Sequence, residues 1–211
     1  MTGADAGRRR RTPSTHLTEE LLQAAESLLV RDGLAGLTVR AVAAEAGVAP
    51  MGVYSRLGGK FGLVAALLAR GFDRLRAALD LGGEPDPRAG DPGARLRTCF
   101  LQYREFALAN PELYAIMFDR TIPNASETAQ VRERAADCFG MLARHVELAA
   151  AANMLATPDQ MEAAQQIWNA LHGAVSLELC GLAQTPDPVA TYSAFLDTVL
   201  RGLFRQPSNG N

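Results

Sequence analysis

Residues 38–54 read Thr38-Val39-Arg40-Ala41-Val42-Ala43-Ala44-Glu45-Ala46-Gly47-Val48-Ala49-Pro50-Met51-Gly52-Val53-Tyr54, and this stretch has the spacing of a helix-turn-helix. Thr38 suits the amino-terminal cap of a first helix, and small apolar residues recur after it at helical spacing. Gly47 ends that helix because glycine readily adopts the left-handed conformation that turns the chain. Pro50 near the start of the next segment, where a missing backbone N–H costs nothing, predicts a second helix over residues 49–57. The stretch predicts DNA recognition, and any packed pair of short helices is the alternative.

Capping residues and helix breakers divide the remaining chain into further helices. The first is expected to begin at Thr18 and to end at Gly33. After Gly58 and Gly59, a long fourth helix is expected with an apolar stripe, which consists of Phe61, Val64, Leu68, Phe72, Leu75 and Leu79. A loop at 81–93 follows, and then helices are expected at about 93–109, 111–118, 125–155, 159–182 and 188–204. No stretch shows the alternation of a β-strand, so the fold class predicted is all-α.

Composition limits the function classes. The chain has 211 residues and 48% hydrophobic content, enough for one large or two small domains with a substantial core. No apolar run approaches the roughly 20 residues that span a bilayer, so we expect a cytoplasmic protein that does not enter the membrane. Three cysteines, Cys99, Cys138 and Cys180, are far apart and lack histidines at ligand spacing, so buried free thiols are expected, with no metal and no cofactor.

Charge is unevenly distributed along the chain. Residues 1–60 contain 8 basic and 6 acidic residues, whereas residues 61–211 contain 13 basic and 17 acidic residues. Arg8, Arg9, Arg10 and Arg11 lie just before the first helix. They form either an arm that follows DNA or a solvated tail, and the sequence leaves both interpretations open.

A family resemblance covers most of the chain. Within residues 17–68, the motifs that carry it are Thr38-Val39-Arg40-Ala41-Val42-Ala43, Ala46-Gly47-Val48, Val53-Tyr54 and Gly59-Lys60-Phe61. They resemble the amino-terminal domain of TetR-family transcriptional regulators. Trp168, His172 and Gly173 resemble the Trp-His-Gly signature of one subgroup of the family's carboxy-terminal domains. The resemblance implies an all-helical homodimer in which the first three helices bind double-stranded operator DNA. It also implies a larger carboxy-terminal domain that dimerises and accepts a small-molecule effector.

Four segments are expected on this basis. Residues 1–14 form a basic flexible arm, and residues 15–60 form the three-helix DNA-binding domain. Residues 61–206 form the helical bundle that binds the effector and dimerises, and residues 207–211 form a tail. The function expected is a repressor that a small hydrophobic or aromatic effector releases from DNA.

The candidate DNA contacts fall into two groups. A recognition helix presents its first turn to the base edges, which assigns Ala49, Pro50, Met51 and Gly52 to the major groove, followed one turn later by Ser55 and Arg56. Arg56 is a candidate for guanine or, equally, for a phosphate. By resemblance, Thr38, Tyr54 and Lys60, the chain's only lysine, match positions that hold phosphates. Ser55, Arg56 and Leu57 depart from the residues common after Tyr54, and Gly59 replaces a stronger helix cap.

Aromatic residues in the second half suggest an effector site between helices. The candidate lining consists of Tyr103, Phe106, Tyr114, Phe118, Trp168 and His172, and Met117, Phe139, Met141 and His145 are further candidates. Each is also an ordinary core residue, and His172 is either a hydrogen-bonded core histidine or an effector ligand. Glu178 is expected to be a satisfied carboxylate. The last two helices carry more apolar residues than one short helical core can cover, which predicts a homodimer with a four-helix interface. These residues are Leu177, Val189, Tyr192, Phe195, Leu196, Val199, Leu200 and Leu203.

Other function classes receive less support. No Ser-His-Asp set, metal-ligand spacing or phosphate loop is present, so the chain is not expected to be an enzyme. A helical hydrolase or oxidoreductase would show itself by turnover or a bound cofactor. The main alternative is a helical protein-interaction module without specific DNA binding, which salt-dependent retardation of random DNA would exclude.

Overall fold

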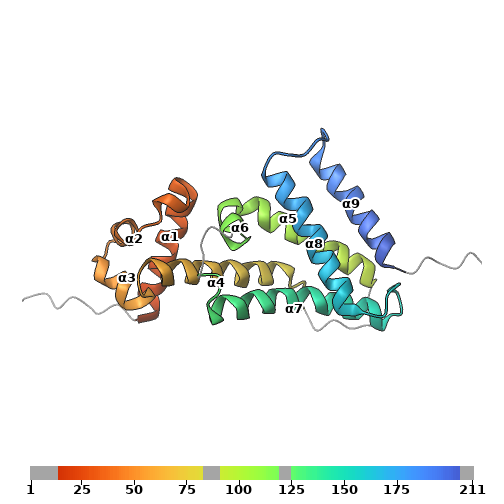
Figure 1. Cartoon of the computed structure of the whole chain (residues 1–211), viewed down its shortest axis with the longest axis horizontal. Coiled ribbons are helices and arrows are strands. Elements are labelled where there is room, and N and C mark those ends of the chain that lie inside the picture. Colours follow the sequence, from red (N-terminus) through yellow and green to blue (C-terminus); the bar gives the residue numbers. More distant parts are fainter. Residues whose placement is uncertain (1–13, 83–90, 119–124, 205–211) are drawn as a thin grey trace, which may run out of the picture. The chain divides into compact units, whose positions relative to one another are not determined.

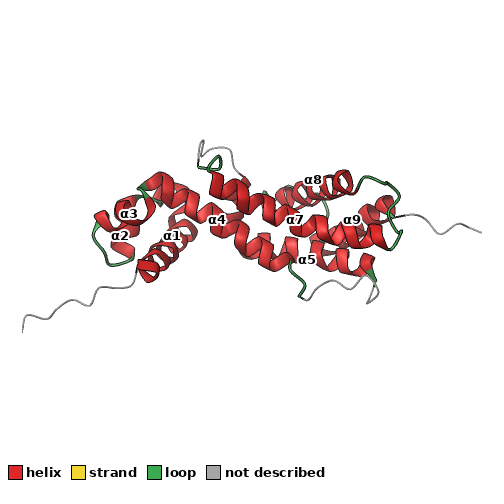
Figure 2. Cartoon of the chain, turned by 90° about the horizontal axis from the view of Figure 1, so that it is seen from below, coloured by secondary structure: helices red, strands yellow, loops and turns green. Residues whose placement is uncertain are grey.

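The computed structural model describes residues 14–82, 91–118 and 125–204, and within these ranges the chain forms nine α-helices (Figure 1). The same ranges contain no β-strand, only an isolated antiparallel bridge between Leu155 and Phe204 (Figure 2). The predicted all-α fold is confirmed. The expected arm up to residue 13, including Arg8 to Arg11, and the tail at 207–211 lie outside the described residues. None of the described helices combines the length and hydrophobicity needed to span a membrane.

The amino-terminal unit consists of α1 (Ser14–Gly36), α2 (Val39–Glu45), α3 (Pro50–Leu57) and the first turns of α4 (Lys60–Leu79). The start expected at Thr18 is wrong, because α1 begins at Ser14. Its first turns precede the first buried residue, Leu21, and consist mostly of polar residues, so no apolar pattern marks where the helix begins. Gly33 does interrupt the helix with φ 66°, but helical backbone resumes and continues to Gly36. The helices expected around the turn are confirmed.

Helix α4 is shared by two compact units, which divide after Leu67. The domain boundary expected from the sequence, between residues 60 and 61, lies at the start of this helix. Most of the predicted stripe is buried, namely Val64, Leu68, Phe72, Leu75 and Leu79. Phe61 is the exception, because half of its surface (50%) is exposed. A helical side chain leans toward the amino-terminal end of its helix, and Phe61 is only the second residue of α4, so its ring extends past the packed face.

The carboxy-terminal unit contains the rest of α4 together with α5 (Pro92–Ala109), α6 (Pro111–Phe118), α7 (Ala129–Ala151), α8 (Gln160–Leu179) and α9 (Pro188–Leu203). Helix α5 packs against each of the four helices that follow it. Aspartate or threonine caps begin four of these helices, and the capping residues are Asp91, Thr128, Asp159 and Asp187. Such side chains satisfy amide groups that the first helical turn leaves without partners.

Two of the three cysteines are buried as expected. Burial raises the pKa of the Cys99 and Cys138 thiols to about 12, so both remain protonated and unreactive at neutral pH. Cys180 is exposed, which contradicts the prediction. It is the carboxy-terminal cap of α8, where the chain leaves the bundle.

The corner between α3 and α4 depends on a close approach of two backbone segments. A β-carbon at Gly62, in the first turn of α4, would overlap the carbonyl oxygen of Leu57, the last residue of α3. No side-chain rotation relieves such an overlap, since the opposing atom belongs to the backbone. Glycine is therefore required at Gly62, and it holds the end of α3 against the start of α4.

We predict opposite effects for two Gly→Ala substitutions inside helices. Gly62→Ala should lower the free energy of unfolding by about 1 to 3 kcal/mol, because the added methyl group forces the α3–α4 corner apart. Gly140→Ala is the control, because Gly140 is an exposed glycine of α7 and its added β-carbon would meet nothing within 4 Å. It should raise the free energy by about 0.5 to 1 kcal/mol through helix propensity. Urea denaturation followed by circular dichroism measures both, and a Gly62→Ala protein as stable as wild type would contradict the assignment.

Candidate nucleic-acid interface and effector site

The helix-turn-helix is built by local hydrogen bonds around Thr38 and Gly47. The Thr38 side-chain oxygen accepts a hydrogen bond from the backbone N–H of Ala41 at 3.1 Å, which confirms the predicted cap of α2. Gly47 has φ 66°, and the N–H of Val48 then donates to the carbonyl of Ala43 at 2.9 Å. The predicted left-handed conformation of Gly47 is confirmed. Helix α3 begins three residues later at Pro50, so the proline lies at the start of the helix as expected.

One side chain anchors α3 while its opposite face stays in solvent. Val53 is completely buried, whereas Met51 is 71% exposed and Tyr54 is 55% exposed. The remaining predicted base-contact residues are also at the surface, with Ala49, Pro50, Ser55 and Arg56 exposed and Gly52 half-buried. The structure therefore brings the candidate residues together on one short helix whose outer face is accessible.

Hydrogen bonds within the unit limit what two candidates can do. The Ser55 hydroxyl donates to the carbonyl of Gly52 at 3.1 Å, so toward a base it offers its oxygen as an acceptor. Thr38 uses its oxygen to cap α2, which leaves its own hydroxyl proton for an anion at the start of the helix.

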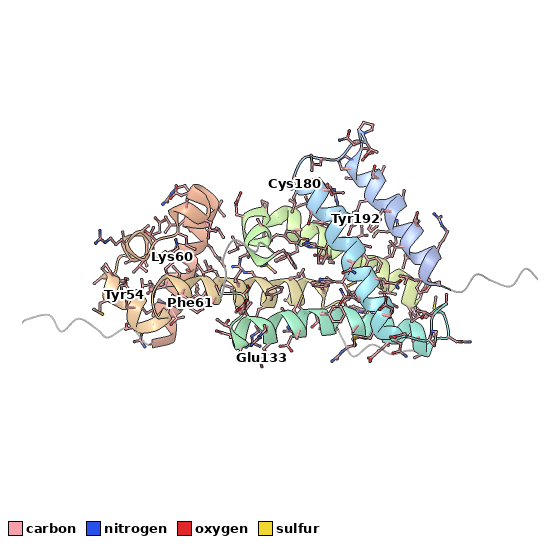
Figure 3. The ribbon with its side chains drawn as sticks, viewed as in Figure 1. Tyr54, Lys60, Phe61, Glu133, Cys180 and Tyr192 are labelled. Atoms are coloured by element: carbon pink, nitrogen blue, oxygen red, sulfur yellow. The ribbon has the colours of Figure 1, made fainter. Side chains whose placement is uncertain are left out.

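Basic and phenolic groups lie beside this face. Tyr54 on α3 and Lys60 at the start of α4 are both exposed and belong to the same compact unit (Figure 3). Arg31 of α1 forms an ion pair with Glu45 of α2, with a distance of 3.3 Å between Nη2 and Oε2. This exposed pair contributes little stability, but it ties the two supporting helices together.

Five of the six candidate effector residues form one aromatic cluster in the carboxy-terminal unit. The ring centroids of Tyr103 and Trp168 are 5.7 Å apart, and those of Phe118 and His172 are 4.5 Å apart. Tyr114 stacks on His172 at 5.7 Å. Phe106 is buried on α5, three residues after Tyr103. Among the described residues, its ring makes no contact with the rings of the other five.

A chain of hydrogen bonds runs through this cluster. The hydroxyl oxygens of Tyr103 and Tyr114 are 2.9 Å apart, and the Tyr114 hydroxyl lies 2.8 Å from Nδ1 of His172. Burial raises the pKa of both phenols and lowers the pKa of His172, so near pH 7 the phenols are protonated and the imidazole is neutral. With the ring proton of His172 on Nε2, Tyr114 donates to Nδ1 and Tyr103 donates to Tyr114. The three helices α5, α6 and α8 are joined by one neutral polar chain.

A second polar contact joins α5 to α8. Arg104 donates to both carboxylate oxygens of Glu178, from Nε at 2.8 Å and from Nη2 at 2.5 Å. The expectation that Glu178 is satisfied is confirmed. The same guanidinium lies 5.4 Å from the ring centroid of Tyr192 on α9, whose hydroxyl donates to the carbonyl of Phe100 at 3.0 Å. Sequence spacing gave no signal for this pairing, because its partners are distant along the chain.

A groove of about 460 Å³ lies between α8 and α9, away from the aromatic cluster. Its walls include Ala170, Ala174, Leu177, Leu182, Pro188, Thr191 and Phe195. None of the six candidate effector residues lines it. Ala170 and Ala174 of α8 are small, which leaves space for the groove. No sequence pattern predicted the groove.

The apolar residues of the last two helices divide into buried and exposed sets. Tyr192, Leu196 and Leu203 are at most 7% exposed, because α9 packs on α5 and α8, so these three belong to the core of the chain itself. Leu177 and Val189 do remain in solvent, with 55% and 64% of their surfaces exposed. Leu182, which the prediction did not include, is 57% exposed.

His145 belongs to the core instead of the aromatic cluster. It is 2% exposed, and its Nε2 lies 3.0 Å from the carbonyl oxygen of Leu79 at the end of α4. Arg95 donates from Nε to His145 Nδ1 at 3.3 Å. These roles require a neutral ring with its proton on Nε2, and burial, the main cause, lowers the pKa of His145. His145 therefore has a structural role that joins α4, α5 and α7.

These features define a class of protein, namely a helix-turn-helix DNA-binding protein with a second, all-helical unit. Family comparisons agree over both units. Residues 21–67 match the tetR family of bacterial regulatory proteins, and residues 96–201 match the tetracyclin repressor-like carboxy-terminal domain. The chain belongs to the TetR family of transcriptional regulators, and its function is DNA-binding regulation of transcription.

Individual relatives show the same similarity over nearly the whole chain. A solved protein with unknown function from Rhodococcus sp. RHA1 is 30% identical, with a TM-score of 0.79, over 95% of this chain and 100% of that one. An uncharacterized HTH-type transcriptional regulator from Mycobacterium tuberculosis is 27% identical over 94% of this chain and 86% of its own length. The TetR family transcriptional regulator PfmR from Thermus thermophilus shares the fold, with 18% identity and a TM-score of 0.60 over 88% of this chain and 99% of that one.

We predict that mild acid destabilises the folded chain through buried His145 and half-buried His172. An unfolded histidine has a pKa of 6.5, and burial in the folded protein lowers the pKa of His145 and of His172. Between the two values the unfolded chain binds more protons, so the stabilisation is present above pH 6.5 and is lost as the pH falls toward the folded values. Urea denaturation at a series of pH values measures this. His145→Gln should flatten the profile, and an unchanged slope in that variant would show that His145 is not responsible.

Proposed function

We propose that this protein is a transcriptional repressor that binds a two-fold symmetric operator as a homodimer and is released by a small hydrophobic or aromatic effector. The observation that carries this proposal is the exposed outer face of α3, which buried Val53 anchors. The second unit of the protein contains the aromatic cluster, in which hydrogen bonds link Tyr103, Tyr114 and His172. We further propose that Trp168, His172 and Gly173 assign the carboxy-terminal domain to the Trp-His-Gly subgroup. The protein acts in the cytoplasm, where its operator is.

The amino-terminal contacts separate into base reading and phosphate binding. Ala49, Pro50, Met51 and Gly52 enter the major groove, where Met51 contacts thymine methyl groups, and Ser55 and Arg56 follow one turn later. Thr38, Tyr54 and Lys60 hold phosphates on either side. The exposure of Met51 and Tyr54, together with the unused hydroxyl proton of Thr38, supports this division.

A homodimer brings two recognition helices to successive major grooves, about 34 to 36 Å apart. The dimer forms through α8, α9 and the loop between them, because Leu177 on α8, Leu182 in the loop and Val189 on α9 are exposed. Leu177 and Leu182 also line the apolar groove. A two-fold axis lets the same patch serve both partners. Residues 61–206 therefore act as the dimerisation and effector domain.

The effector enters the aromatic cluster of Tyr103, Tyr114, Phe118, Trp168 and His172, with Phe106 as an additional wall. Aromatic rings supply an apolar lining, and the Tyr103–Tyr114–His172 chain supplies a few neutral polar groups. Such a lining favours an uncharged aromatic or hydrophobic molecule over a phosphorylated one, because no arginine or lysine belongs to the cluster.

We predict that phosphate and base contacts respond differently to substitution. Lys60→Ala and Tyr54→Phe should weaken binding to all duplexes similarly, each by about 1 kcal/mol, because phosphates carry no sequence information. Only Lys60→Ala should also lower the salt dependence, since it alone removes a charge. Binding to a selected operator and to a random duplex, titrated at several salt concentrations, measures both effects.

Arg56→Ala provides the contrast within the same experiment. If Arg56 reads guanine, its loss should relax the preference at one position of each half-site by roughly 1 to 3 kcal/mol. Equal losses on operator and random DNA would refute the base-reading role. Failure of the wild-type protein to bind DNA in a salt-dependent way would favour the alternative, an interaction module.

We predict that an effector changes the fluorescence of Trp168, the chain's only tryptophan, and weakens operator binding by about 5-fold to 150-fold. Linkage requires operator DNA to weaken effector binding by the same factor. A screen of small aromatic and aliphatic compounds by Trp168 emission identifies ligands, and titration with and without operator measures the coupling. Ligands that alter the Trp168 signal but leave operator affinity unchanged would contradict release by this site.

A further inference from the structure

Tyr54 and Gly59 form a contact that joins the recognition helix to the turn after it. A β-carbon at Gly59 would lie 3.0 Å from Cε1 and 3.2 Å from Cδ1 of the Tyr54 ring. Those separations are tighter than ordinary contacts between carbon atoms. The ring therefore lies against the α-carbon of Gly59, in space that a side chain at this position would occupy.

The backbone at Gly59 also requires glycine. Its φ is 90°, in the region that residues with a side chain rarely adopt, and the residue is buried although Tyr54 is 55% exposed. The carbonyl of Gly59 accepts a hydrogen bond from the N–H of Leu63 at 3.0 Å, so Gly59 occupies the amino-terminal cap position of α4. Gly59 is thus held in place by α4, and it provides a fixed wall for the ring of Tyr54.

We infer that Gly59 is a positioning residue for DNA binding, which sets the direction in which the Tyr54 hydroxyl meets a phosphate. This inference rests on the proposed phosphate contact of Tyr54. An exposed tyrosine samples several rotamers, and a wall on one side of its ring removes some of them before DNA arrives. Glycine at position 59 lacks a side chain that could cap α4, but it leaves room for the Tyr54 ring and so orients the phenol.

The neighbouring Gly58 provides a matched control. Its φ is 68°, also positive, but a β-carbon there would meet nothing within 4 Å. Gly58→Ala therefore introduces backbone strain at the same turn without touching the ring, whereas Gly59→Ala introduces strain and displaces the ring. The difference between the two variants isolates the contact.

The test measures the affinity of the full-length protein for a random-sequence duplex, with each glycine variant made in the wild-type and Tyr54→Phe backgrounds. In the wild-type background, Gly59→Ala should bind about fivefold more weakly than Gly58→Ala, the same factor that is expected for Tyr54→Phe. In the Tyr54→Phe background, which keeps the ring but lacks the hydroxyl, that difference should disappear. A merely structural role of Gly59 would leave the difference unchanged between backgrounds, and this result would overturn the inference.

A second measurement does not depend on the folding of Gly59→Ala. Selective labelling of the wild-type protein should reveal a nuclear Overhauser contact between the Tyr54 ring protons and the Gly59 α-protons, both free and bound to DNA. Loss of this contact in the complex would overturn the inference while leaving DNA binding intact. A wild-type protein that does not bind the duplex at all would overturn the proposed function together with it.

Discussion

The contact between the α-carbon of Gly62 and the carbonyl oxygen of Leu57 is the constraint on which the amino-terminal unit depends. Any side chain at Gly62 would overlap that oxygen, so the first turn of α4 can lie only where it does because the residue is glycine. Buried Val53 fixes α3 from the other side, against the helices that precede it. The recognition helix is therefore held between the supporting helices and the start of α4, and its outer face is left for DNA.

Helix α4 extends this constraint into the second unit. Its first turns belong to the helix-turn-helix unit, and the helix continues without interruption to Leu79, whose carbonyl accepts from buried His145. One continuous helix thus has one end fixed by a backbone contact and the other by a hydrogen bond to a neutral histidine. In the proposed function, this is the element through which effector binding alters the recognition helices.

The sequence alone predicted what depends on local chemistry. The Thr38 cap, the left-handed Gly47 and the proline at the start of α3 are features of neighbouring residues, and each was found as expected. Contacts between distant residues carried no such signal: Arg104 pairs with Glu178, and the Tyr103–Tyr114–His172 chain joins three helices. Periodicity also does not show where a packed surface ends: Phe61 fits the apolar stripe of α4, yet half of its surface is exposed.

Native-state hydrogen exchange is the measurement that tests this account most directly, because it reports which amides open together. If Gly62 joins α3 to α4, the amides of Val53 to Leu57 and those of Leu63 to Leu67 should exchange with one common opening free energy and the same denaturant dependence. In Gly62→Ala, the amides of α3 and those of α4 should exchange with different opening free energies. The account would be contradicted if, in the wild-type protein, the first turns of α4 opened independently of α3.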